Sequence, residues 1–333
     1  MRVNPSVTLA RNVRYPCWTG TRRTETAVTA HFSAVPERAI PDLGAYDIGI
    51  IGAGRVGSVL GAALLAAGHS VVGLSVRSEA SLARAAGLLP DVPAAPAVEV
   101  ARRSTGILLS VGDDALAGMV AELAASGAVG PGQLVAHVSG RHGLAVLQPL
   151  ADLGAATLAI HPAMTFTGGP EDLPRIRGTV FGVTALGRHW PLAEQLVSAV
   201  GGSAVAVPEE LRPLWHAGLA HGANHLVTLV ASALDVVRAT GVADPAAVLR
   251  PLLTAALDNA LASGDAALTG PVARGDAATV ASHLDALASY APAERPTYLA
   301  ISRATASRLH DPNLDLLDVL AGLPLGADAA DAS

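Results

Sequence analysis

Residues 47–78 constrain the fold more than any other part of the chain. An apolar run leads directly into the segment Gly52–Gly57, which reads Gly-Ala-Gly-Arg-Val-Gly, and an Ala/Leu helix pattern and a second apolar run follow within about 30 residues. The first glycine permits a tight turn, the second lets the backbone approach a phosphate, and the third lets the helix pack on the strand. The helix N-terminus also offers unpaired N–H groups to an anion. The segment therefore predicts a strand–turn–helix–strand unit that binds a dinucleotide.

The end of the second apolar run indicates which dinucleotide is bound. Sites for NAD commonly hold an acidic residue there, which binds the ribose hydroxyls. This chain instead has Ser75, Arg77 and Ser78. A guanidinium and two hydroxyls can bind a ribose 2′-phosphate through charge-assisted hydrogen bonds, whereas a carboxylate would repel it. The expected cofactor is therefore NADP, with NADPH as its reduced form; the alternative is that Arg77 is an ordinary solvated residue.

The chain divides into two regions of different periodicity. From residue 46 to 208, strand patterns alternate with helix patterns, which is typical of an α/β protein with a doubly wound, mostly parallel Rossmann sheet. Strand signals then stop and long Ala/Leu helix patterns follow. We expect a NADP-binding Rossmann domain at 46–208 and an all-α substrate and dimerisation domain at 209–325. Residues 1–45, which have no strand or helix period, are expected to form a disordered extension, and 326–333 a tail.

The hydrophobic periodicity also gives the individual elements. The expected strands are 47–52, 71–76, 106–111, 133–138, 156–161, 179–184 and 203–207. The expected helices are 55–67, 79–87, 114–126, 143–152, 190–201, 209–240, 245–263, 276–289 and 294–308. Asp244 and Asp276 are candidate N-caps for two of these helices.

Composition excludes several classes of protein. The net charge is −6 and the arginines are scattered, so the chain lacks the basic patch expected of a nucleic-acid partner. The hydropathy of residues 47–74 approaches that of a membrane span, but Arg55, the glycines and the strand–helix–strand pattern argue against one, so no membrane segment is expected. Cys17 is the only cysteine, which excludes an internal disulfide. This cysteine usage, with no secretory apolar region near the start, predicts a cytoplasmic protein.

Lysine is absent from the chain. All 22 residues counted as Lys+Arg are arginine. Every mechanism that needs a lysine as general acid or as a Schiff base is therefore excluded.

Three segments follow expected strands and should face the cofactor. The three segments are 111–114, 137–140 and 161–166. Ligands of open parallel sheets bind outside the carboxyl ends of the strands. Ser139 could donate a hydrogen bond to a substrate carbonyl, or it could cap a helix. His161 could donate to a substrate oxygen, or it could be a buried histidine bonded to backbone. The residues expected to contact the cofactor are Gly52, Gly54, Arg55, Val56, Gly57, Ser75, Arg77, Ser78, Val111, Gly112, Ser139 and Gly140.

Further motifs connect the chain to a known family. They are Leu158–Phe166, Trp215–His225 and Leu268–Asp276, together with Gly52–Gly57 and His137–Gly140. Over about residues 46–310 the chain resembles a bacterial family of Rossmann-like proteins with a C-terminal helical domain of unknown function, within the 6-phosphogluconate dehydrogenase-like superfamily. Some members look like an alternative ketopantoate reductase of pantothenate synthesis, which is the most concrete activity that the resemblance implies.

The resemblance points to one helix as the catalytic wall. Related 3-hydroxyacid dehydrogenases and ketopantoate reductases carry Lys-x-x-x-Asn there, in which lysine protonates the carbonyl and asparagine orients the substrate. Asn224 matches the asparagine, but Ala220 stands at the lysine position. His216 lies on the same helical stripe and could replace the lysine as general acid, or it could be structural. His221 and His225 fall on another face, and no third ligand at a suitable spacing supports a metal site there.

Arg274 lies in a Gly/Pro-rich segment ahead of a candidate helix. It could clamp a substrate carboxylate with two hydrogen bonds, or it could pair with Asp276 or with a neighbouring subunit.

These features favour an NADPH-dependent oxidoreductase that reduces a small 2-oxo acid, with ketopantoate as the leading candidate. One alternative is a non-catalytic NADP-binding sensor or scaffold that lost catalysis with the lysine. Another is an imine reductase resembling pyrroline-5-carboxylate reductase. The expected catalytic residues are His216, Asn224, His161, Ser139 and Arg274.

The sequence also predicts a homodimer. Charged residues are sparse across 209–264, so an isolated helical domain would expose larger apolar patches than soluble monomers tolerate. The alternative is that these helices close their own core against the Rossmann domain.

Overall fold

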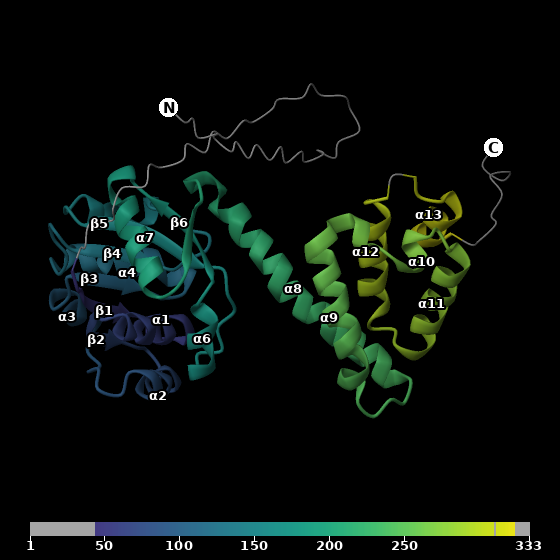
Figure 1. Ribbon diagram of the computed structural model, residues 1–333, viewed down its shortest axis with the longest axis horizontal. Coiled ribbons are helices and arrows are strands. Elements are labelled where there is room, and N and C mark those ends of the chain that lie inside the picture. The colour runs from purple at the N-terminus through teal and green to yellow at the C-terminus, as the bar shows by residue number, and fades with distance from the viewer. Residues whose placement is uncertain (1–43, 310, 324–333) are drawn as a thin grey trace, which may run out of the picture. The chain divides into compact units, whose positions relative to one another are not determined.

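Figure 1 shows the computed structural model, which describes residues 44–309 and 311–323. The extension expected at residues 1–45 falls almost wholly outside the described residues, and the tail expected at 326–333 falls outside them entirely. Within the described part, no helix is both long and apolar enough to cross a membrane.

The N-terminal region is built on one seven-stranded sheet with the order β2-β1-β3-β4-β5-β6-β7. Neighbouring strands are parallel except for the pair β5–β6, which is antiparallel. This topology confirms the doubly wound, mostly parallel Rossmann sheet. The strands are β1 (Asp47–Ile51), β2 (Ser70–Ser75), β3 (Gly106–Leu109), β4 (Leu134–His137), β5 (Ala156–Pro162), β6 (Val180–Ala185) and β7 (Ser203–Ala206).

Seven α-helices connect these strands. They are α1 (Arg55–Ala66), α2 (Glu79–Leu88), α3 (Ala97–Arg102), α4 (Asp113–Ala125), α5 (Gln148–Ala151), α6 (Leu173–Ile176) and α7 (Trp190–Ala199). The sequence did not predict α3 or α6, because six and four residues are too few to show a helical period. The helix expected over 143–152 is a short 3₁₀ turn followed by the single turn α5.

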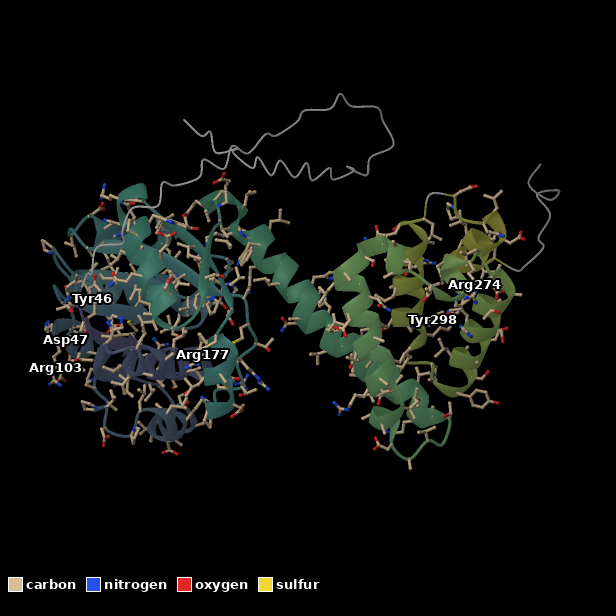
Figure 2. All side chains as sticks on the ribbon, viewed as in Figure 1. Tyr46, Asp47, Arg103, Arg177, Arg274 and Tyr298 are labelled. Atoms are coloured by element: carbon tan, nitrogen blue, oxygen red, sulfur yellow. The ribbon has the colours of Figure 1, made fainter. Side chains whose placement is uncertain are left out.

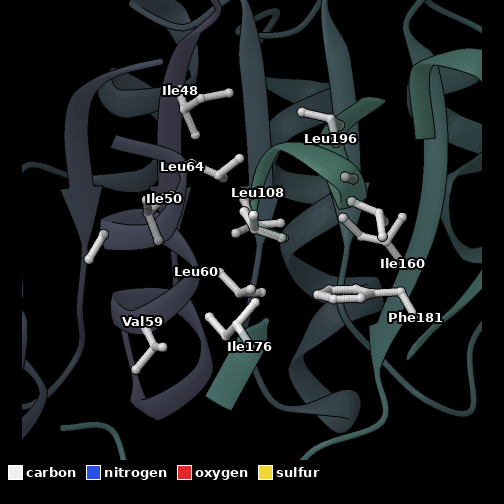
Figure 3. Close-up of a cluster of buried hydrophobic side chains, with 14 of the residues drawn as sticks. Ile48, Ile50, Val59, Leu60, Leu64, Leu108, Ile160, Ile176, Phe181 and Leu196 are labelled. Carbon is white, nitrogen blue, oxygen red and sulfur yellow. The ribbon is translucent and has the colours of Figure 1, made fainter. Parts of the chain in front are cut away.

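Apolar side chains cover both faces of the sheet, as parallel sheets require. Along β3 the side chains alternate: Leu108 joins one core cluster, while Ile107 and Leu109 join the other. Figure 3 shows the first cluster, in which Phe181 of β6 lies among aliphatic side chains. The second cluster includes residues of α3, α4 and α5. The sheet is therefore rigid, and the loops at its carboxyl edge start from fixed positions.

The C-terminal region is helical, as predicted. Its helices are α8 (Arg212–Ala239), α9 (Pro245–Ser263), α10 (Gly270–Ala273), α11 (Ala277–Tyr290), α12 (Arg295–Ala306) and α13 (Leu314–Ala321). The Asp244 and Asp276 carboxylates accept hydrogen bonds from the backbone N–H groups of Ala247 (3.0 Å) and Thr279 (3.1 Å), so both cap helices as expected. Val280, on α11, lies in a small buried core formed by α10 to α13.

Helices α8 and α9 carry large apolar side chains that the described residues leave exposed. Leu214 is 70% exposed and Val227 is 68% exposed on α8; on α9, Leu252 is 64% exposed and Leu261 is 80% exposed. Neither helix contributes a fully buried residue to the core formed by α10 to α13. The two helices therefore present apolar surface that the described part of one chain does not cover.

Candidate functional site

The turn after β1 has the geometry that its glycines predict. Gly52 has a φ of +92°, and its N–H and that of Ala53 donate to the carbonyl of Ser75 at 2.9 and 3.0 Å. A Cβ on Gly52 would lie 2.7 Å from the carbonyl carbon of Ser110. Only glycine fits this position, where the turn joins the ends of β1, β2 and β3.

The other two glycines of the motif have different roles at the start of α1. A Cβ on Gly57 would lie 2.5 Å from the carbonyl oxygen of Gly52, so the helix must pack closely on the turn. A Cβ on Gly54, in contrast, would meet nothing closer than 3.9 Å. No side chain caps α1, and its first N–H groups face this space. Arg55 is exposed and Val56 packs against the core. The open space at Gly54 and the uncapped start of α1 fit a dinucleotide phosphate.

The residues expected to recognise the 2′-phosphate lie together at the end of β2. The carbonyl of Ser75 is occupied by the glycine turn. The hydroxyl of Ser78 accepts a hydrogen bond from the N–H of Ser81 at 3.2 Å and so caps α2. Arg77, between them, is exposed. The guanidinium of Arg77 forms no ion pair within the described residues, so it is the charged group available there.

Ion pairs join the loops after β3 and β4. Val111 and Gly112 follow β3, and Gly112 is the N-cap of α4. The guanidinium of Arg141 lies 3.2 Å from the carboxylate of Asp113 and 2.8 Å from that of Asp114. These contacts hold the loop that contains Ser139 and Gly140 beside the loop that contains Gly112.

His137 organises the loop after β4 from inside. Its side chain is fully buried. Its Nδ1 accepts a hydrogen bond from the N–H of Ser139 at 3.1 Å, so its Nε2 carries the proton and donates to the carbonyl of Gly143 at 2.8 Å. Burial lowers the pKa of His137 to about 4, which keeps the ring neutral. The hydroxyl oxygen of Ser139 accepts from the N–H of His142 at 3.1 Å, so it caps this turn rather than a helix.

Arg212, the first residue of α8, fastens that helix to the sheet. Its side chain is fully buried, and its Nη2 donates to the carbonyl of Ser139 at 2.6 Å. Its Nη1 donates to the hydroxyl of Thr184, on β6, at 3.0 Å. Just before it, Glu209 accepts hydrogen bonds from the N–H groups of Leu144 (2.6 Å) and Ala145 (3.0 Å). The start of α8 is thus fixed to the loop after β4.

Fixing α8 brings His161, His216 and Gly140 together. The indole N–H of Trp215 donates to Nδ1 of His161 at 3.1 Å. The rings of His161 and His216 meet edge to face with centroids 5.5 Å apart. A Cβ on Gly140 would lie 2.5 Å from Cδ2 of His216 and 2.9 Å from Nε2 of His161. A Cβ on Gly182 would likewise clash with the indole of Trp215. Residues from three separate segments therefore converge at the carboxyl edge of the sheet.

The hydrogen bond from Trp215 sets the protonation of His161. Because Nδ1 accepts, the proton of the neutral ring is on Nε2, beside Gly140. Burial, followed by the nearby His216 and Arg212, lowers the pKa of His161 to about 4. His161 is therefore neutral at ordinary pH and presents a hydrogen-bond donor at the site.

Sequence reasoning missed Glu209, Arg212 and Trp215. Trp215 stands inside a motif string, but nothing in the string indicated that its indole would bind His161. A buried arginine has no periodic signal that separates it from an exposed one. The contacts of Arg212 also join residues 28 to 73 positions apart in the chain.

The other two expected catalytic residues are not joined to this cluster by any contact among the described residues. Asn224 is exposed, further along α8. Arg274 follows α10 and is exposed, and Figure 2 shows it among the C-terminal helices. It forms no ion pair with Asp276 in the described part of the chain. His221 and His225 contact each other through their Nδ1 atoms at 2.8 Å, and no group of three or more metal-ligating side chains lies among the described residues.

Two sequence families match the chain. Residues 37–162 match a Rossmann-like domain, and residues 179–305 match a domain of unknown function, DUF2520. Together they confirm the predicted pairing of a Rossmann-like domain with a C-terminal helical domain of unknown function. The second match begins at residue 179, just before β6, rather than at α8. No curated protein matches the sequence.

Solved structures share the fold over most of the chain. A candidate NADP oxidoreductase from Bacteroides fragilis is 21% identical with a TM-score of 0.69, and the match covers 79% of this chain and 99% of that one. An imine reductase from Myxococcus stipitatus in complex with NADP⁺ is 18% identical with a TM-score of 0.55, covering 78% and 91%. A pyrroline-5-carboxylate reductase from Coxiella burnetii is 16% identical with a TM-score of 0.50, covering 80% and 97%. At these identities the likeness shows the fold.

The lowered pKa of His161 predicts a pH-dependent stability. Between pH 6.5, the usual pKa of histidine, and about 4, the unfolded chain binds a proton that the folded protein does not. The free energy of unfolding should therefore fall as the pH falls through this window. In His161→Asn, whose amide oxygen can still accept from the indole, the slope should be smaller by up to about 1.4 kcal/mol per pH unit. Urea unfolding at several pH values measures both slopes. His225→Asn, a change of an exposed histidine, is the control. If the pH dependence of the unfolding free energy is unchanged in His161→Asn, the lowered pKa assigned to His161 is wrong.

Proposed function

We propose that the protein is an NADPH-dependent oxidoreductase that reduces a small 2-oxo acid, with ketopantoate as the leading candidate. The observation that carries the proposal is the placement of the neutral His161 and of His216 against Gly140. This cluster stands at the same edge of the sheet as the turn Gly52–Gly57. Ligands of doubly wound sheets bind at that edge.

The residues present fit a dinucleotide of the NADP type. Gly52–Gly57 and the uncapped start of α1 would hold its pyrophosphate, and Arg77 its 2′-phosphate. Gly112 and Gly140 would lie against its ribose and nicotinamide. When bound, NADPH supplies a hydride, and the protein supplies orientation and electrostatics. The fold that the chain shares with an NADP⁺-bound imine reductase supports this cofactor.

The imidazoles of His161 and His216 would bind the substrate oxygen and protonate it. The Nε2–H of His161 would donate to the carbonyl and stabilise the negative charge that develops on its oxygen. Since His161 is neutral, His216 would deliver the proton that completes the alcohol. Trp215 holds the ring of His161 in the tautomer that this role needs. The pair would thus replace the lysine that the chain lacks.

The substrate carboxylate needs a cation, and the nearby guanidiniums have other partners. Arg212 is bonded to backbone and to Thr184, and Arg141 is paired with Asp113 and Asp114. Arg274 would then be the clamp, brought to the site by the C-terminal helices of the same chain or of a second subunit.

Among the described residues, the guanidiniums near the histidine cluster are bound to other groups. This also favours a second candidate, the reduction of a cyclic imine. A cyclic imine need not carry a carboxylate, and the chain shares its fold with an imine reductase. A screen of 2-oxo acids and cyclic imines, followed by the loss of NADPH absorbance, separates the two. NADPH binding without turnover of either class would instead support a non-catalytic sensor.

Cofactor preference provides the first test. NADPH should bind at least about tenfold more tightly than NADH, roughly 1.4 kcal/mol, because Arg77 binds the 2′-phosphate. Arg77→Ala should remove most of this preference, whereas Arg250→Ala, a change on α9 in the C-terminal region, should leave it intact. Titration of each dinucleotide measures the ratio. Equal affinities in the wild type, or an unchanged ratio in Arg77→Ala, would refute the assignment.

The catalytic helix provides the second test. His216→Ala should lower kcat roughly 10²- to 10⁴-fold with little change in NADPH affinity, because a general acid acts in the transition state. Asn224→Ala should change both kcat and KM, since we assign it to substrate orientation. His225→Ala, on another face of α8, is the control. Full activity in His216→Ala would transfer the role to His161 or to water.

We infer that the protein is a homodimer built by its C-terminal helices. Exposed apolar side chains on α8 and α9, such as Leu252 and Leu261, would be buried in the interface. Light scattering at micromolar concentration should give twice the 33.4 kDa chain mass. The double variant Leu252→Glu/Leu261→Glu should lower that mass, whereas Leu82→Glu, an exposed leucine on α2, should not. A wild-type mass of one chain, unchanged by NADPH, would exclude the dimer.

A further inference from the structure

The loop after β5 is held by a buried carboxylate. Asp172 is fully buried, and its Oδ2 accepts hydrogen bonds from the N–H groups of Thr167 and Gly168, both at 2.8 Å. These two N–H donors fix the backbone at Gly168, which has a φ of +89°. The loop 167–172 is rigid at this point because its hydrogen bonds are internal.

Two arginine side chains pack on Gly168. A Cβ there would lie 2.5 Å from Cδ and 2.8 Å from Nε of Arg84, and 3.0 Å from Cγ of Arg55. Arg84 comes from α2 and is half-buried, whereas Arg55 is the first residue of α1. Helix α1 packs against both α2 and α6, the helix that follows the loop; Figure 1 shows the three helices side by side. Gly168 thus leaves the space that both stems occupy.

Neither of these guanidiniums has an acidic partner among the described residues. Five other arginines pair with carboxylates; they are Arg103, Arg141, Arg175, Arg238 and Arg308. The carboxylate of Glu171, in the same loop, instead accepts from the hydroxyl of Thr167 at 2.6 Å. Two positively charged side chains whose stems meet at Gly168, and which have no acidic partner among the described residues, favour an anion near them.

Their position indicates which anion. Arg55 directly follows Gly54 at the turn that we assign to the pyrophosphate, and α2 begins directly after Arg77 and Ser78 at the end of β2. Arg84 therefore lies within the region that the adenosine half of a dinucleotide would occupy. A half-buried guanidinium whose stem is already packed loses little freedom on binding, so it is suited to recognise phosphate.

We propose that Arg84 binds a phosphate group of the dinucleotide and that Gly168, fixed by Asp172, positions it beside Arg55. This assignment rests on the proposed function, since it requires NADPH to bind at Gly52–Gly57. The phosphate is either the 2′-phosphate or the pyrophosphate. Both present the same oxygens to a guanidinium.

Binding of NADPH and NADH to Arg84→Gln tests the proposal by calorimetry on the full chain, with no turnover needed. The affinity for NADPH should fall roughly 10- to 100-fold, as expected for loss of a charged hydrogen bond. A loss for NADPH alone assigns the 2′-phosphate, and an equal loss for NADH assigns the pyrophosphate. Arg250→Gln, on α9, is the control and should bind as the wild type does.

The double variant Arg84→Gln/Gly168→Ala tests the positioning role of the loop. As a single variant, Gly168→Ala should weaken NADPH binding. Its effect should largely vanish when Arg84 is already glutamine, because both changes remove the same contact. Additive losses would overturn the positioning role. Wild-type affinities in a folded Arg84→Gln would overturn the assignment of Arg84 while leaving the proposed function intact. A wild-type protein that binds neither dinucleotide would overturn both.

Discussion

The buried guanidinium of Arg212 is the contact on which the arrangement of the site depends. Burying a charge is costly unless hydrogen bonds replace the lost water. Here the carbonyl of Ser139 and the hydroxyl of Thr184 accept from it, and burial lowers its pKa only to about 10, so it stays charged. By joining the loop after β4 to β6, this side chain fixes where α8 begins. The positions of Trp215 and His216 follow from that start.

In the function that we propose, fixed neutral dipoles would take the place of a mobile cation. Nδ1 of His161 is occupied by the indole of Trp215, so the orientation of its Nε2–H is determined before any ligand arrives. His137 plays a parallel part beneath the loop, since both of its ring nitrogens are used by backbone. Preorganised donors of this kind are effective because they need no rearrangement during reaction.

The sequence could predict what depends on local geometry. The turn at Gly52 and the caps of Asp244 and Asp276 are decided by neighbouring residues, and the structure confirms them. The convergence of His161 with Gly140 follows from one general rule, that loops at the carboxyl ends of parallel strands meet. The partner of Arg212 could not be predicted, because Ser139 is 73 positions away and no pattern links them. The roles of Asn224 and Arg274 depend on how helices meet other surfaces, which periodicity does not encode.

A crystal structure of the NADPH complex would test the central claim most directly. We expect phosphate density at Gly52–Gly57 and the nicotinamide ring against Gly140, with its reactive carbon facing the Nε2–H of His161 across a gap wide enough for a small substrate. The hydrogen bond from Trp215 to His161 should persist in that complex. A nicotinamide bound away from the two histidines, or a ring of His161 that turns so that Nε2 no longer faces Gly140, would contradict it.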